Sequence, residues 1–243
     1  MKINLLPLLV LVTASAFAQT PVNKTFAVQA GQKIKMHFDY PQLIKVTTWN
    51  KNEIAITGEV SINTGENDDA FKLESEVSGN EILVSGEIRN LKSLPHHVTI
   101  WNNGQKMSFR TKEDYNKYAS EHGRNYESMS WGTDIDIFLE IKVPENMQTD
   151  ILLTYGTLEI KNFNGPLIAE STYGGVDAAL AEKSIGDLRA ETSYGQIYTN
   201  FNCKFTGSEF RDFHTVVNAK PGNGPSYSFE SKYGNVYLRK ALQ

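Results

Sequence analysis

Four Tyr-Gly pairs recur in the C-terminal part of the chain, each within a similar short phrase. The phrases read DILLTYGTLEI, LIAESTYGGVDA, LRAETSYGQIYT and YSFESKYGNVYL, and their tyrosines lie 18, 21 and 39 residues apart. A degenerate copy, Phe213-His214-Thr215-Val216, falls inside the longest interval and restores a period near twenty. A fixed period of this length, with apolar residues alternating inside each copy, is typical of stacked β-strand units. The repeat therefore predicts an all-β protein.

Alternation within each copy predicts two short strands joined at a Tyr-Gly corner, because residues two apart share one face of a strand. The glycine permits a turn that other residues resist. One face of the first strand is expected to be the core side, as in Leu167, Ala169, Ser171 and Tyr173. The second strand places an apolar residue at one matching position in every copy, namely Leu158, Val176, Ile197, Val216 and Val236.

The repeated tyrosines share both face and period, so they are predicted to stack in one column inside the corner. The column would contain Tyr155, Tyr173, Tyr194, Phe213 and Tyr233. Each buried hydroxyl is then expected to bond a backbone group at the adjoining turn, since an unpaired one costs about 1–3 kcal/mol. If the rings face solvent instead, the column is a binding stripe.

The N-terminal half shows the same alternation with less regularity. Residues 43–60 and 71–88 each predict two strands around a short turn, and residues 134–143 predict one more. Residues 94–132 interrupt this series and are predicted to form an insertion that contains one helix. Thr111 suits the N-cap and Gly123 the position after the helix, with Tyr115, Tyr118, Ala119 and His122 on the face that would pack on the sheet.

The first eighteen residues have the features of a secretory signal peptide. A basic start precedes an apolar run, and Ala16-Phe17-Ala18 suits cleavage before Gln19. The run is shorter than the roughly 20 residues that span a bilayer. No cysteine follows the cleavage site, so no lipid anchor is expected. We expect residues 19–243 to form a single domain, exported to the periplasm or secreted.

Composition excludes several classes of protein and partner. The net charge of −4 gives no basic surface for nucleic acid. Cys203 is the only cysteine, so no disulfide can form within the chain. The five histidines have no zinc-site spacing, and no catalytic motif or cofactor fingerprint is present. We therefore predict no catalytic, cofactor-binding or metal-binding residues.

Two sets of side chains are candidates for ligand contact. Glu170 and Glu191 take the same outward position in successive copies and, on adjacent strands, would lie about 4.8 Å apart. Such a pair could serve acid-base chemistry or bind a cation, or it could be an ordinary solvated face. Tyr198 and Tyr237 also point outward and could contact a sugar or a protein surface.

The strand pair LIKVTTWNKNEIAITGEV, the strand IFLEIKVPENM and the Tyr-Gly-x-apolar phrases resemble a family of secreted bacterial β-strand-repeat domains named "putative adhesins". The similarity runs from about Phe26 to Leu238. It implies a β-solenoid, either a right-handed β-helix or a related β-roll or sandwich, and brings no catalytic residues.

Two hypotheses follow for function. The first is a non-catalytic module with a structural or adhesive role, which binds an unidentified protein or glycan at the cell envelope. The second is a polysaccharide lyase or hydrolase that uses the Glu170/Glu191 row as acid and base, with residues 94–132 as a groove wall.

Overall fold

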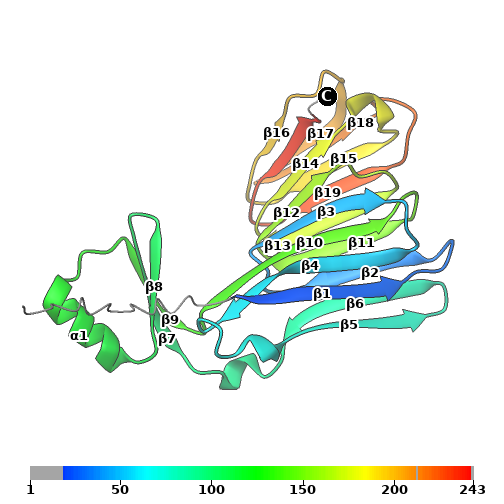
Figure 1. The fold of residues 1–243 in the computed structure, drawn as a ribbon. Helices are drawn as coiled ribbons and strands as arrows, with labels where there is room; N and C mark the ends of the chain where they lie inside the picture. Colours follow the sequence, from blue (N-terminus) through cyan, green and yellow to red (C-terminus); the bar gives the residue numbers. More distant parts are fainter. Residues whose placement is uncertain (1–18, 212, 242–243) are drawn as a thin grey trace, which may run out of the picture.

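The protein is described here from a computed structural model, which covers residues 19–211 and 213–241. The predicted signal peptide lies outside the described residues. The structure is all-β apart from one helix, as the sequence predicts, and consists of two large facing sheets and a smaller three-stranded sheet that projects from them (Figure 1). A single apolar core lies between the two large sheets.

The eight-stranded sheet has the order β1-β4-β10-β3-β12-β14-β20-β16. Its strands are β1 (Thr20–Ala27), β4 (Glu53–Ile62), β10 (Ile135–Pro144), β3 (Leu43–Trp49), β12 (Thr157–Lys161), β14 (Val176–Leu180), β20 (Val236–Lys240) and β16 (Ile197–Thr199). Every predicted strand of the N-terminal half is present. The two strands of residues 43–60 are not neighbours, however, because β10 lies between them, parallel to β3 and antiparallel to β4.

The nine-stranded sheet has the order β17-β18-β15-β19-β13-β11-β2-β6-β5. Its strands are β17 (Phe205–Arg211), β18 (His214–Ala219), β15 (Leu188–Thr192), β19 (Tyr227–Ser231), β13 (Leu167–Tyr173), β11 (Thr149–Tyr155), β2 (Lys33–Phe38), β6 (Glu81–Ile88) and β5 (Phe71–Ser78). Three single 3-10 turns complete the large sheets' connections, at Asp68–Ala70, Leu91–Ser93 and Glu182–Ser184.

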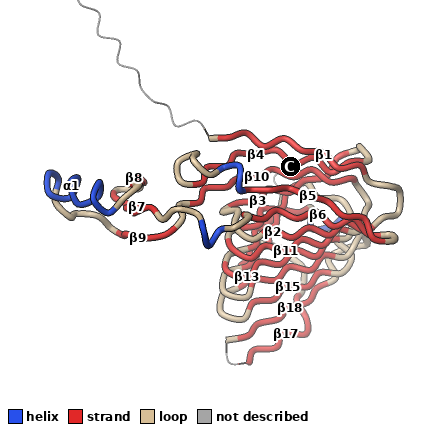
Figure 2. The backbone as a smooth tube through the Cα atoms, turned by 90° about the horizontal axis from the view of Figure 1, so that it is seen from below, coloured by secondary structure: helices blue, strands red, loops and turns tan. Residues whose placement is uncertain are grey.

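Five units cross from the nine-stranded to the eight-stranded sheet through a tyrosine corner, and we call each of them a rung. The rungs are β2–β3, β11–β12, β13–β14, β15–β16 and β19–β20, and neighbouring rungs pair in parallel. The predicted core face is confirmed for Leu167, Ala169 and Ser171, which are all buried. Figure 2 shows the rungs stacked behind one another.

The order of the rungs in space differs from their order in the chain. The last rung, β19–β20, lies between β13–β14 and β15–β16, so Tyr227 is paired with both Leu167 and Leu188. Residues 188–219 therefore join the rest of the two sheets through the C-terminal rung.

The prediction of a degenerate rung at residues 213–216 is wrong. These residues begin β18, which pairs antiparallel with β17 on one side and β15 on the other. Val216 accordingly lies in the nine-stranded sheet opposite Glu191, instead of beside Leu158 and Val176. Phe213 sits at the hairpin turn with a φ of 74°. Without a glycine corner, the chain reverses within one sheet and does not cross to the other.

The third sheet and the helix form a unit that we call the arm. It contains β7 (His97–Asn102), β8 (Gln105–Phe109), α1 (Lys112–His122) and β9 (Ser128–Gly132), in the sheet order β8-β7-β9. The predicted caps are confirmed, since the Asp114 amide donates to Thr111 Oγ1 at 3.0 Å and Gly123 has a φ of 81°. The helix buries Tyr115 and Ala119 against Val98 and Ile100 of this small sheet, and not against the large sheets as predicted.

Candidate functional site

The tyrosines of the rungs form one continuous stack, but on the outside of the corner. The side chains of Tyr155, Tyr173, Tyr194 and Tyr233 are 45–62% exposed, and that of Phe213 is 79% exposed. The predicted stacking is therefore confirmed and the predicted burial is wrong. We call the six exposed or half-buried rings at the corners the tyrosine stripe, and they are Tyr40, Tyr155, Tyr173, Tyr233, Tyr194 and Phe213.

The rings of the stripe lie nearly parallel and follow the spacing of the strands. Tyr173 and Tyr233 have centroids 4.9 Å apart at 5°, and Tyr233 and Tyr194 are 5.0 Å apart at 5°. The stack continues to Tyr40 at one end and Phe213 at the other, with centroid distances up to 6.2 Å. Because ring faces contact one another, the stripe presents its edges and hydroxyls to solvent.

Glycines hold the backbone of adjacent corners together and leave no room there for a side chain. A Cβ placed on Gly174 would lie 1.7 Å from the carbonyl oxygen of Gly156, and one on Gly195 would lie 1.8 Å from that of Gly234. Since the corner backbones meet on the inside, the tyrosine just before each glycine is directed outward.

A buried hydroxyl two residues before each of three tyrosines occupies the inside of the corner. Ser171 Oγ donates to the Gly156 carbonyl at 3.0 Å, and Thr192 Oγ1 donates to the Gly234 carbonyl at 2.9 Å. Ser231 Oγ makes the same contact with Gly174 at 2.6 Å. These Ser and Thr side chains satisfy the corner carbonyls, a role predicted for the tyrosine hydroxyls. Within the described residues, the hydroxyls of the four Tyr-Gly tyrosines make no such bond.

The rows on either side of the stripe are rich in uncharged hydrogen-bonding groups. Hydroxyl side chains precede three of the tyrosines, and amide side chains follow several of the corners; the set comprises Thr154, Thr172, Ser193, Gln42, Asn235 and Gln196. The carboxylate of Asp39 precedes Tyr40. Lys232 adds one cation, with its Nζ 5.6 Å from the centroid of the Tyr233 ring. The surface around the stripe therefore matches a ligand that carries many hydroxyl groups.

Tyr40 belongs to the stripe but was absent from the predicted column. Its ring stacks on Tyr155 at 5.6 Å and 17°. Proline follows it where the other corners have glycine, which removes the Tyr-Gly signature. The alternation of Lys33–Phe38, continued to residue 40, is the signal that could have found it.

Tyr198 and Tyr237 form a second, shorter aromatic pair on the outer face of the eight-stranded sheet. Their centroids lie 5.1 Å apart at 11°, and Arg239 lies over the Tyr237 ring at 5.3 Å. The Tyr237 hydroxyl accepts a hydrogen bond from Asn235 Nδ2 at 3.1 Å, which connects this pair to the row beside the stripe.

The two predicted carboxylates, Glu170 and Glu191, lie on the outer face of the nine-stranded sheet but are not neighbours. Glu230 of the inserted rung is paired with both, so the three form a row. Burial raises the pKa of Glu170 above its ordinary value, and the nearby charges of Glu230, Asp150 and Glu191 raise it further. Burial, followed by the charge of Glu191, likewise raises the pKa of Glu230.

Glu191 differs from the other two acids because two basic side chains contact it. The guanidinium of Arg189 bonds one carboxylate oxygen, and His214 Nε2 lies 3.2 Å from the other. Among the described residues, no group of three or more His, Cys, Asp or Glu side chains could hold a metal ion.

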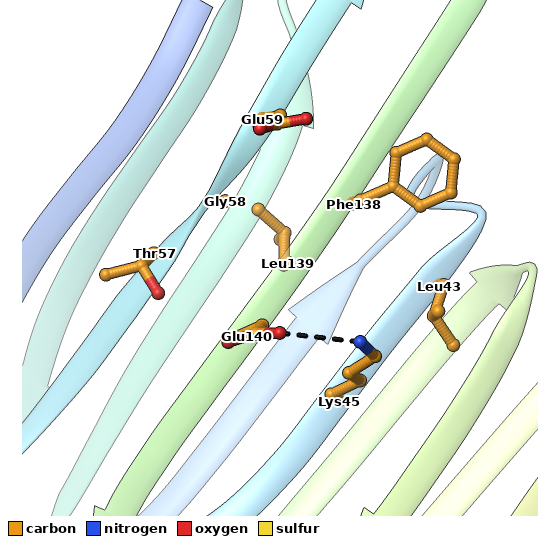
Figure 3. Close-up of a pocket in the computed structure, with 8 residues that line it drawn as sticks. All are labelled: Leu43, Lys45, Thr57, Gly58, Glu59, Phe138, Leu139 and Glu140. Carbon is orange, nitrogen blue, oxygen red and sulfur yellow. Dashed lines mark hydrogen bonds and ion pairs between the residues drawn. The ribbon is translucent and has the colours of Figure 1, made fainter.

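A shallow depression of about 460 Å³ lies on the outer face of the eight-stranded sheet, above Gly58 (Figure 3). A Cβ at Gly58 would lie 2.1 Å from the Phe138 carbonyl oxygen, so the strand pair requires glycine there. Phe138 is 40% exposed beside it, and Lys45 Nζ pairs with Glu140 Oε1 at 3.4 Å. The depression offers a contact for one apolar group.

Comparisons with known proteins give two distant structural likenesses. No protein-family model matches the chain, and neither does any curated protein. The chain is similar to a "putative cell adhesion protein" from Clostridium sporogenes ATCC 15579, with 14% identity and a TM-score of 0.47 over 91% of this chain and 100% of that one. It is also similar to a "putative adhesin" from Bacteroides fragilis NCTC 9343, with 10% identity and a TM-score of 0.23 over 92% and 98%. Neither likeness is close enough to indicate a function. Within the described residues, no helix is long and apolar enough to cross a membrane.

Proposed function

We propose that this chain is an exported, non-catalytic binding module with an adhesin-like role at the cell envelope, and that the tyrosine stripe is its contact surface. Its scaffold would be a solenoid-like stack of rungs whose last turn is inserted out of order. The observation that carries the proposal is the run of six stacked rings along one edge of the molecule, five of them exposed and one, Tyr40, half-buried.

Exposure of the rings is the main argument for binding. Isolated apolar side chains on a surface need no explanation, whereas a contiguous row of large ones marks an interaction surface. Tyrosine is suited to this role because it offers a broad rigid ring and a hydroxyl while losing little conformational entropy. The buried Ser and Thr hydroxyls already satisfy the corner carbonyls, so the tyrosine hydroxyls are free for a ligand.

The geometry favours an elongated ligand that runs along the stripe. Six rings at the ~4.8 Å strand spacing extend over roughly 24 Å. A ligand along this line meets a phenol hydroxyl at each rung, with amide and hydroxyl side chains on either side. A linear glycan supplies hydroxyls at short regular intervals, which suits rows where uncharged hydrogen-bonding groups outnumber the charged Asp39 and Lys232. We therefore place a glycan ahead of a protein as the partner.

The experiment is a glycan array probed with the purified chain from Gln19 onward. Binding to extended polysaccharides, but not to single sugars, supports a ligand that spans several rungs. Absence of binding to every polysaccharide, together with binding to an envelope protein, would contradict the glycan assignment while leaving a binding role in place.

The carboxylate row supports the alternative of a polysaccharide-active enzyme. The pKa values of Glu170 and Glu230 are raised, and Glu191 in the same row is paired with Arg189, so the row holds carboxyl groups in different environments, as an acid-base pair requires. The test is polymer degradation followed by reducing-end release. Loss of such an activity in Glu170→Gln or Glu230→Gln, with binding retained, would favour the enzyme.

A further inference from the structure

The free edge of the arm is an exposed strand with no charged residue. Strand β9 is the last strand of the three-stranded sheet and pairs only with β7 within the described structure. Its sequence is Ser-Met-Ser-Trp-Gly, and Met129 and Trp131 are 51% and 46% exposed. Proteins usually protect an edge strand with lysine, proline or a bulge, because its free backbone groups pair readily with another strand. β9 has none of these residues.

We propose that β9 pairs with β9 of a second copy of this chain, in antiparallel orientation about a two-fold axis at Ser130. This contact is independent of the tyrosine stripe and joins two arms into one continuous six-stranded sheet. An interface of this kind uses the same surface on both copies and must therefore be complementary to itself.

The residues of β9 are self-complementary about Ser130. A two-fold axis there places Met129 opposite Trp131 of the partner subunit, and Trp131 opposite the partner's Met129. Both side chains lie on the face that carries Val98 and Ile100, since Trp131 is paired with Val98 and Met129 with Ile100. Each thioether then contacts an indole ring, and contacts between sulfur and an aromatic ring are favourable.

Charges on the same face are complementary across this axis. Lys112 Nζ lies 4.5 Å from the centroid of the Trp131 ring. Glu127 directly precedes β9. Its Oε1 accepts a hydrogen bond from the Asn103 amide at 3.2 Å, and the two-fold axis places its backbone diagonal to Trp131 of the partner subunit. The two-fold axis brings this carboxylate toward Lys112 in both halves of the contact. Identical arms therefore meet with opposite charges next to each other.

The position of the arm allows this contact without a collision between the large sheets of the two copies. Figures 1 and 2 show the arm projecting beyond the ends of the large sheets. A five-residue strand buries less than the ~1,200 Å² of a standard stable interface, so the dimer is a weak one that forms at high local concentration. Such a dimer carries two tyrosine stripes and increases avidity for a polymeric ligand.

The test is a disulfide at the axis, made in the Cys203→Ser background. Directly opposite residues of an antiparallel pair have Cα atoms about 4.5–5.5 Å apart, within the range of a disulfide. Ser130→Cys is expected to give a covalent dimer on mild oxidation. Ser128→Cys is the matched control, because it faces Gly132 of the partner subunit and not its own copy. Equal cross-linking of the two variants, or none in Ser130→Cys, overturns the proposal.

A second measurement follows the dimer without a disulfide. Sedimentation velocity of the full exported chain should show a dimer fraction that rises with concentration. Lys112→Glu should lower the association constant at least threefold, and the added Glu127→Lys change should restore it. A monomer at every concentration, or failure of the double swap to restore association in folded protein, contradicts the two-fold contact.

Discussion

The rungs and the arm both expose aromatic rings, but different interactions position them. In the rungs, glycine corners stack backbone on backbone and a buried hydroxyl closes each turn, so the rings repeat at the strand spacing. In the arm, a small core of Val98, Ile100, Tyr115 and Ala119 holds one helix on three short strands. The rungs are therefore fixed by long-range parallel pairing, and the arm by contacts local in sequence. The comparison predicts that changes in the rungs destabilise the whole protein and that changes in the arm have local effects.

The largest expected effect is at the glycine corners. Gly174→Ala places a Cβ about where the Gly156 carbonyl lies, with a separation of 1.7 Å. We expect a loss of more than about 4 kcal/mol in the free energy of unfolding, which is a severe effect for one methyl group. Gly132→Ala in the arm is the matched control, since no atom lies within 4 Å of its Cβ. Urea unfolding measures both variants. If Gly174→Ala and Gly132→Ala both lower the free energy of unfolding only slightly, the backbones of adjacent corners can move apart without destabilising the fold.

The next largest loss of stability is expected in the inserted C-terminal rung. Phe229 is fully buried, and Phe229→Ala should cost about 3–5 kcal/mol. Because residues 188–219 join the sheets through this rung, amide hydrogen exchange in that segment should accelerate before exchange in residues 43–62 does. Uniform acceleration across both segments would contradict the order of the rungs. Ala119→Gly in α1 should instead accelerate exchange in the arm alone.

Substitutions on the inside and the outside of one corner are expected to lower the free energy of unfolding by intermediate amounts. Thr192→Val removes a buried hydroxyl that donates to Gly234 and accepts from Gly195, and should cost about 1–3 kcal/mol. Tyr194→Ala removes two stacking contacts on the exposed side and should cost about 1–2 kcal/mol. Thermal unfolding measures both. A much larger loss for Tyr194→Ala would indicate that the stripe serves mainly to stabilise the fold.

The smallest expected effect is the contribution of the carboxylate row to the pH dependence of stability. Because the folded state raises the pKa of Glu170, its charged form is disfavoured by folding, and protonation relieves this cost as the pH falls through the raised pKa. Glu170→Gln should therefore stabilise the protein above that pKa, by less than about 1 kcal/mol given solvent screening. The difference from wild type should shrink as the pH approaches the ordinary carboxyl value of 4.5. If the stability difference between Glu170→Gln and wild type grows toward acidic pH, folding does not raise the pKa of Glu170. Arg89→Gln is a surface control, because Arg89, directly after β6, forms an exposed ion pair with Glu74 of β5.

Strand faces could be predicted because alternation is a local property of the sequence. Leu167, Ala169 and Ser171 are buried as their spacing indicates, and the caps of α1 were found from Thr111 and Gly123. The order of the rungs was not predictable in this way. Each rung presents the same pattern to its neighbours, so Tyr227 can pair with Leu167 and with Leu188 equally well.

The orientation of the tyrosines was predicted wrongly because alternation does not continue through a corner. The strand ends at the tyrosine in β11 and β13 and two residues before it in β15 and β19. The backbone of the following glycine contacts the next rung on the inside. The signal for this arrangement is the hydroxyl residue two positions earlier, as in Ser171, Thr192 and Ser231. A buried hydroxyl that bonds the corner carbonyl makes a buried tyrosine unnecessary.

Binding by the stripe is tested most directly by removing its rings without touching its glycines. The triple variant Tyr173→Thr, Tyr194→Thr and Tyr233→Thr is compared with the double variant Tyr198→Thr and Tyr237→Thr. Both remove stacked surface tyrosines, of which only Tyr237 is half-buried, and keep a residue suited to strands. Titration of both folded variants with the polysaccharide bound by wild type gives the result. The account predicts at least a tenfold weaker association for the triple variant and little change for the double variant. Unchanged binding by the triple variant would contradict it.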